Sequence, residues 1–160
     1  MYENRPWLAH NGSVPATLEY PDSSVFGLLE ADVRKHPRLP ALVFMGRTTA
    51  KARLLERITL MSRAFAARGM KAGDRVIICL PNMPQAVVAF YALSRLGAIP
   101  APIHPLSTTP EIETYVRITG ARWAITLDGF YPRFAPVLDA KGIERTIVCS
   151  IGGEAAFPTS

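Results

Sequence analysis

Residues 73–103 read GDRVIICLPNMPQAVVAFYALSRLGAIPAPI, and this stretch decides the fold. Its opening segment RVIICL (75–80) is apolar throughout rather than alternating in polarity, which is typical of a strand buried on both faces of a parallel sheet. The apolar segment at 84–96 has the length of a helix, and Gly97 is a natural helix end. Residues 99–103 are then extended. The stretch therefore predicts one strand–helix–strand unit of a parallel sheet.

The same alternation continues downstream. Thr108 and Glu111 have the spacing of a capping box, so a helix is expected from there to about Gly120. Further elements are expected at residues 122–127 (strand), 131–141 (helix) and 145–151 (strand). The order βαβαβαβ predicts an α/β fold, with helices on the faces of a parallel sheet and right-handed crossovers.

The residues before 73 differ in character. Residues 1–23 are rich in proline and predict an extended arm with apolar anchors, lying across the body of the domain. Helices are expected at 25–35, capped by Ser23 or Ser24, and at 51–68, separated by a short hairpin of which the first strand is 41–45. The chain thus divides into the arm (1–23), one α/β unit (24–151) and a loop-like tail (152–160).

Composition bounds the classes of function. A chain of 160 residues with 49% hydrophobic and 19% charged residues is long and apolar enough for one folded domain. Cys79 and Cys149 cannot form a disulfide framework, and neither they nor the three histidines have the spacing of a zinc site. No apolar run approaches the ~20 residues of a membrane span, and no signal peptide opens the chain. The cytosol is the default location.

Basic residues are concentrated in one segment. Residues 34–75 hold 11 Lys or Arg and two acids, a net charge of +9 within a chain whose total is +5. Attraction to anionic lipid or to an acidic ligand is one interpretation, and a solvated outer helix face is the favoured one. Nucleic-acid binding is not expected, because the basic residues lack interleaved aromatic side chains and a recognisable module.

Three polar residues follow the ends of predicted strands. Asn82, His104 and Asp128 would lie at the carboxyl edge of a parallel sheet, where ligands bind. Local roles are favoured for all three: helix caps for Asn82 and Asp128, with Gln85 reaching back, and a turn for His104. Cys79 is interpreted as inert core, and packing is favoured over an acyl pocket for the aromatic residues Trp123, Phe130, Tyr131 and Phe134. No residue is assigned a catalytic, cofactor-binding or metal-binding role.

Seven blocks of the sequence carry a family resemblance. They are RPWLAH (5–10), PATLEYPD (15–22), PALVFMGR (40–47), GDRVIICLPNMPQ (73–85), LSRLGAIPAPIHPL (93–106), TPEIE (109–113) and GARWAITLD (120–128). Together and in this order they closely resemble the N-terminal segment of AMP-forming acyl-CoA synthetases, and the opening is most similar to long-chain fatty-acid–CoA ligases. At the start of the helix expected at 51–68, where the family often has a hydroxyl cap, this sequence has Ala50.

The resemblance implies a two-step reaction, in which ATP and a fatty acid give an acyl-adenylate and pyrophosphate, and coenzyme A then displaces AMP. It also implies that ATP, Mg²⁺ and CoA are handled by parts of the enzyme downstream of this segment. Gly152, Gly153 and Glu154 do not form a phosphate loop, because no cation follows them. The segment alone is therefore expected to be catalytically inactive, with the remainder of the parent enzyme as its partner.

Two alternatives remain beside this interpretation. One is a free-standing binding or interaction module derived from such an enzyme. The other is a Rossmann-like nucleotide-binding domain, which is disfavoured because no G-x-G-x-x-G follows any predicted strand.

The helix expected at 83–96 also suggests a second copy of the chain as a partner. It is apolar on every side, and the other predicted helices have polar faces of their own. We expect one of its faces to be uncovered in this chain, and the chain to self-associate through Val88, Phe90 or Tyr91.

Overall fold

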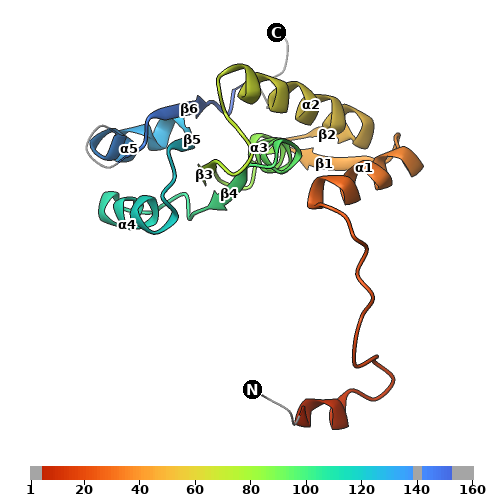
Figure 1. Ribbon diagram of the computed structural model, residues 1–160. Coiled ribbons are helices and arrows are strands. Elements are labelled where there is room, and N and C mark those ends of the chain that lie inside the picture. Colours follow the sequence, from red (N-terminus) through yellow and green to blue (C-terminus); the bar gives the residue numbers. More distant parts are fainter. Residues whose placement is uncertain (1–4, 139–141, 153–160) are drawn as a thin grey trace.

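Four parallel strands form the central sheet in the order β4-β3-β5-β6, and a separate antiparallel hairpin pairs β1 with β2 (Figure 1). The computed structural model describes residues 5–138 and 142–152. The elements are η1 (Pro6–His10), α1 (Val25–Lys35), β1 (Pro40–Phe44), β2 (Arg47–Ala50), α2 (Lys51–Ala67), β3 (Arg75–Cys79), α3 (Pro84–Leu96), β4 (Ile99–Pro102), α4 (Thr109–Thr119), β5 (Trp123–Leu127), η2 (Asp128–Phe130), α5 (Tyr131–Leu138) and β6 (Arg145–Cys149).

The predicted α/β fold with its parallel sheet is confirmed, and the strand order fixes where the helices lie. The chain moves one way along the sheet from β3 to β4 and the opposite way from β4 to β5, so right-handed crossovers must place α3 and α4 on opposite faces. Side chains of β3 alternate accordingly. Val76 and Ile78 belong to the core that includes α3, and Ile77 and Cys79 belong to the core with α4 and α5.

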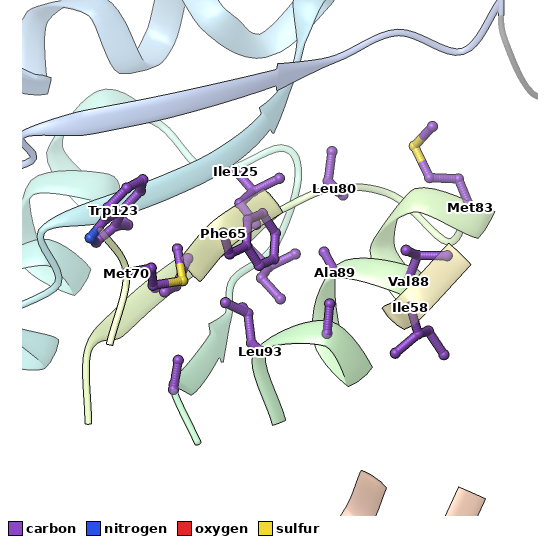
Figure 2. Packing of buried hydrophobic residues seen from close by; sticks show 14 of the residues in the cluster. Ile58, Phe65, Met70, Leu80, Met83, Val88, Ala89, Leu93, Trp123 and Ile125 are labelled. Atoms are coloured by element: carbon purple, nitrogen blue, oxygen red, sulfur yellow. The ribbon is translucent and has the colours of Figure 1, made fainter. Parts of the chain in front are cut away.

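Helix α3 is covered on both sides within the same chain. Its Ala92 and Leu93 are fully buried, and they share a core with Ile58 and Phe65 of α2 and with Ile125 of β5 (Figure 2). Helices α1 and α2 both pack against α3 (Figure 1). The two faces of the sheet therefore carry different helices: α4 and α5 lie on one face, and α3 lies on the other, in a core that it shares with α2.

This arrangement contradicts the expectation of an uncovered face on this helix. Val88 is only 2% exposed, and Phe90 and Tyr91 are partly buried against the same core. The expectation failed because helices α1 and α2, although polar on their outer faces, have enough apolar surface on their inner faces to cover α3. Self-association stays a prediction, now without this support.

Arg95, the one exposed residue of α3, ties the two outer helices together. Its guanidinium lies 5.5 Å from the centre of the Phe26 ring of α1. The Nη1 atom of Arg95 also donates to the hydroxyl of Ser62, a buried residue of α2, at 3.5 Å. The guanidinium group of this exposed side chain thus bridges the two helices.

The helix ends differ in how they are capped. Ser24 caps α1 by accepting a hydrogen bond from the Gly27 amide, and Thr108 and Glu111 form the predicted capping box of α4. In contrast, α2 begins after Ala50, which has an extended backbone and no side chain that could accept a bond. The expected helix at 131–141 begins at Tyr131 as α5, but residues 139–141 and most of the predicted tail lie outside the described residues.

The N-terminal arm does not lie across the body, so that expectation is wrong. Figure 1 shows residues 5–24 running away from the helices and ending in η1, which lies apart from the sheet. Its apolar anchors remain largely exposed, among them Trp7 at 51% and Tyr20 at 81%. Proline spacing identified an extended segment, but it carries no information on what such a segment contacts.

Proline also shapes the outer edge of the sheet. Strand β4 is an edge strand, and the amides of Ile99 and Ile103 donate to carbonyl groups of Asp74 and Ile78 beside it. Successive residues of a strand direct their backbone groups to opposite sides, so the outward positions are Pro100 and Pro102. Neither has an N–H group, and this edge offers no donor to an incoming strand.

A hydroxyl at position 50 should stabilise the protein. Ala50 has the φ of −70° and ψ of 155° that a helix cap requires, so the Ala50→Ser side chain can accept from an amide in the first turn of α2. We expect the free energy of unfolding in urea to rise by about 1 kcal/mol. The control is Ala52→Ser, one residue inside the helix, which should be neutral or destabilising. Equal gains from both changes would contradict the capping argument.

Backbone N–H donors introduced at the outward edge of β4 should promote self-association of the chain. The double change Pro100→Thr and Pro102→Thr returns two outward N–H groups to β4. Light scattering should then show an average mass that rises with concentration more steeply than for the unmodified chain. The control Ala101→Thr adds the same side chain at an inward position and no donor, so its mass should match the unmodified chain. Identical behaviour of the double variant and the control would refute the role of the prolines.

Candidate functional site

The carboxyl edge of the sheet is where the topology favours a ligand. The chain leaves β3 toward β4 and later returns past β3 to β5, so the switch point lies between the ends of β3 and β5. Residues 80–83 follow β3 at this point, and Asp128 follows β5. Two further strands end nearby, at Pro102 and Cys149.

Asn82 is at this edge but does not cap α3. The N-cap residue is Met83, and no side-chain hydrogen bond caps the helix, so the predicted role of Asn82 is wrong. Pro84 occupies the first helical position and has no N–H group, which lowers the need for a cap. The side chain of Asn82 is exposed instead, at the mouth of two hollows described below.

His104 has the turn role that was favoured for it, whereas the prediction that Asp128 caps a helix is wrong: the N-cap residue of η2 is Leu127, and no side-chain hydrogen bond caps η2. The Nδ1 atom of His104 accepts a hydrogen bond from the Leu106 amide at 3.2 Å, within a turn. The carboxylate of Asp128 accepts from the Gly129 amide at 2.7 Å, at the start of η2. Both side chains are exposed, and each is engaged with its own loop rather than with a shared centre.

Gln85 makes a connection that sequence reasoning missed. Instead of reaching back to cap its own helix, its Nε2 atom donates to the Ser150 carbonyl at 2.9 Å, joining the first turn of α3 to the end of β6. Its Oε1 atom is buried and has no hydrogen-bond partner among the described residues. Nothing in the local sequence signals this contact, because its partner is a backbone group far along the chain.

The two cysteines are held as neutral thiols. Cys79 lies in β3, and burial raises the pKa of its thiol to about 11. Its Sγ atom donates to the His104 carbonyl at 3.6 Å. The pKa of the Cys149 thiol is also raised, first by burial and then by the negative charge of Asp128. These environments disfavour the thiolate that a nucleophile needs.

Two apolar hollows open beside Asn82. One has a volume of about 270 Å³ and is lined by residues of β1 and the start of α3, including Leu42 and Met83. The other, of about 260 Å³, lies between α3 and the ends of β3 and β4, with Phe90 and Tyr91 in its wall. Asn82, Ala86 and Val87 line both and form the ridge between them. The Phe90 and Tyr91 rings are in edge contact with their centres 5.5 Å apart.

The carboxyl edge of the sheet is lined mainly by apolar side chains. Within residues 5–138 and 142–152, no group of three or more His, Cys, Asp or Glu side chains could hold a metal ion. Packing is confirmed for three of the four aromatic residues: Phe134 and Trp123 are buried in the two cores, and Phe130 is partly buried. Tyr131 is 38% exposed, so for this residue the prediction is wrong. None of the helices in this part of the chain is long and apolar enough to cross a membrane.

Comparison with known proteins supplies the family context. A model of the family described as AMP-binding enzyme matches residues 29–156. A long-chain-fatty-acid–CoA ligase of Bacillus subtilis is 26% identical over 159 residues, which cover 99% of this chain and 28% of that protein. A long-chain-fatty-acid–CoA ligase of Escherichia coli is 31% identical over 156 residues, covering 92% of this chain and 27% of that protein.

A solved structure agrees with these relatives. The crystal structure of a long-chain-fatty-acid–CoA ligase from Archaeoglobus fulgidus superposes with a TM-score of 0.77 at 27% identity, over 86% of this chain and 29% of that one. The chain thus spans little more than a quarter of the length of the curated relatives it matches.

Two substitutions of Gln85 should show how its hydrogen bond to Ser150 and its buried, unpaired oxygen each affect the free energy of unfolding. In Gln85→Glu the donor to the Ser150 carbonyl becomes an acceptor, so two oxygens oppose each other and a carboxylate loses part of its hydration. We expect a loss of about 2 kcal/mol in the free energy of unfolding at pH 7. Gln85→Met removes the bond and the unpaired oxygen together, and should cost less than 1 kcal/mol.

Urea unfolding of both variants measures the difference. If Gln85→Met is less stable than Gln85→Glu, the hydrogen bond to the end of β6 does not explain how position 85 affects stability.

Proposed function

The chain belongs to the AMP-binding enzyme family, and on that premise we propose that it is the N-terminal scaffold of an acyl-CoA synthetase acting on long-chain fatty acids. The reaction of such an enzyme joins a fatty acid to AMP with release of pyrophosphate, and then transfers the acyl group to the thiol of coenzyme A with release of AMP. The observation that carries the proposal is the alignment with long-chain ligases over 92% or more of this chain.

The proposed role of these residues is structural. The polar groups at the carboxyl edge are used locally, as in the Asp128 and His104 turns, and the two thiols are neutral. The described residues do not fit a site for ATP and Mg²⁺, because they contain neither a glycine-rich loop with a following cation nor a cluster of acidic ligands. We therefore assign no reaction step to any of them.

The apolar hollows at the ridge of Asn82 and Val87 support a scaffold more than a free-standing module. A surface with two adjacent apolar depressions suits contact with further protein. In the proposed enzyme that protein is the remainder of the same polypeptide, and the binding of ATP, Mg²⁺ and CoA is a property of the whole.

A chimera tests this role directly. Residues 1–160 should replace the corresponding segment of the Bacillus subtilis ligase, and exchange of labelled pyrophosphate into ATP should be measured with a long-chain fatty acid and Mg²⁺. We expect the chimera to retain exchange, and residues 1–160 alone to remain at background because nothing in them aligns ATP with a carboxylate. The control chimera carries Ala92→Asp, which places a charge in the fully buried core of α3 and should abolish exchange.

Two outcomes would contradict the proposal. A folded but inactive chimera would favour an independent interaction module. Exchange by residues 1–160 alone, scaling with protein concentration, would show that the chain carries reacting groups itself.

A further inference from the structure

The outer side of β6 is a free edge of the sheet. In the order β4-β3-β5-β6, strand β6 has β5 on one side, and no strand among the described residues pairs with its other side. The Arg145 amide donates to the Arg122 carbonyl at 3.3 Å, so Arg145 directs its backbone groups toward β5. Because these groups alternate along a strand, Thr146 and Val148 direct their N–H and C=O groups outward.

The opposite edge of the sheet leads to the same assignment. The Ile103 amide donates to the Ile78 carbonyl, so Ile78 faces β4 and its neighbour Ile77 faces β5. Continued through the registers of β3 with β5 and of β5 with β6, the alternation turns Ala124 toward β6 and Ile147 toward β5. The residues on either side of Ile147 are therefore again the outward ones.

Residues 145–149 have none of the features that usually shield a sheet edge. Such features are proline, a protruding charge or a bulge, but β6 reads RTIVC and its register with β5 is unbroken. Its one charged side chain, Arg145, is turned back to the Arg68 carbonyl and lies 5.0 Å from the centre of the Trp123 ring. Threonine, isoleucine and valine also favour strands, so this edge suits pairing with another strand.

The other edge of the sheet restricts how two copies of the chain can pair. A head-to-tail contact between β6 and β4 is disfavoured, because Pro100 and Pro102 leave no outward donor on β4. The remaining contact between edges of this sheet is β6 with the β6 of a second copy. An antiparallel arrangement about a two-fold axis closes that contact after two copies and joins the two sheets into one.

One register of this contact satisfies every free backbone group. With the axis at Ile147, Thr146 lies opposite Val148 of the second copy, and the two residues exchange N–H and C=O bonds. The flanking groups are already used: the Glu144 amide donates to the Arg122 carbonyl at 2.8 Å, and the Ser150 carbonyl accepts from Gln85 at 2.9 Å. An axis at Thr146 or Val148 would place a free outward group opposite one of these used groups.

The side chains agree with this register. Val148 is 48% exposed, and Thr146 of the second copy would cover it on the same face of the joined sheet. On the other face, Ile147 would lie beside its own copy, and Arg145 would lie opposite Cys149, so that no like charges meet. The pairing therefore buries apolar surface without placing an unpaired charge at the contact.

We propose that the outer edge of β6 is a self-recognition surface, through which two copies of this chain pair in antiparallel fashion about an axis at Ile147. The partner is a second copy of the chain, and the contact consists of backbone hydrogen bonds between Thr146 and Val148. This inference does not depend on the enzymatic role proposed above.

Hydrogen exchange, measured residue by residue at low and high protein concentration, tests the pairing. In a single chain the amides of Thr146 and Val148 are free, whereas the Ile147 amide faces β5. We expect the protection of Thr146 and Val148 to rise with concentration, in step with the dimer fraction from light scattering. The Ile147 amide should be protected at both concentrations.

Substitutions at Val148 test the same contact by the dissociation constant of the dimer. Val148→Pro removes an outward donor and no bond to β5, so it should weaken the dimer at least tenfold. The control Val148→Thr keeps the donor and the branched shape, and should change the constant less than threefold. Thermal unfolding shows whether each variant remains folded.

A second pair of variants replaces the first if Val148→Pro is unstable. Val148→Lys places a charge at the edge and should also weaken the dimer at least tenfold. Ile118→Lys adds the same charge at a site of α4 that is 70% exposed, and should change the constant less than threefold.

Four outcomes would overturn the proposal. A monomer at every concentration would do so, as would a dimer in which the amides of Thr146 and Val148 stay unprotected, because another surface then forms the contact. Protection independent of concentration would show that the same chain covers this edge. Protection that appears only in the chimera with the Bacillus subtilis ligase would identify the remainder of the enzyme as the occupant instead of a second copy.

Discussion

Helix α3 carries apolar side chains around its whole circumference, and the layers of the molecule are arranged to cover them. Its Val88 and Leu93 are buried in a core that α3 shares with α2, β3 and β5, and both α1 and α2 pack against the helix. Fully burying one such side chain is worth about 1.5–3 kcal/mol, so an uncovered α3 would remove much of the few kcal/mol by which a domain of this size is stable. The hairpin and the two N-terminal helices are therefore part of the fold and not additions to it.

The strands and helices of the α/β unit could be predicted because their signals are local. A continuous apolar run marked β3, and the Thr108–Glu111 capping box marked the start of α4. The cover over α3 and the position of the arm could not be predicted, because both depend on which distant surfaces meet.

Two long-range hydrogen bonds could not be predicted for the same reason. Gln85 donates to a carbonyl 65 residues away, and Arg145 donates to the Arg68 carbonyl at the end of α2 while lying 5.0 Å from the centre of the Trp123 ring.

The candidate site was predictable to a different extent. The sequence placed Asn82, His104 and Asp128 at the carboxyl edge; the turn predicted for His104 is confirmed, and the helix caps predicted for Asn82 and Asp128 are not formed. It did not reveal the paired apolar hollows, since these arise where α3, β1 and β4 come together.

Hydrogen exchange of backbone amides, followed residue by residue, tests most directly whether α3 is an inner layer of this chain. If α2 and α1 cover it, the amides of Ala92 and Leu93 should exchange as slowly as those of Ile77 and Ile125 in the sheet, and only through global unfolding. The arm around Leu18 and Tyr20, which is exposed, should exchange within the dead time. Exchange of α3 at the rate of the arm, while the sheet remains protected, would contradict the account.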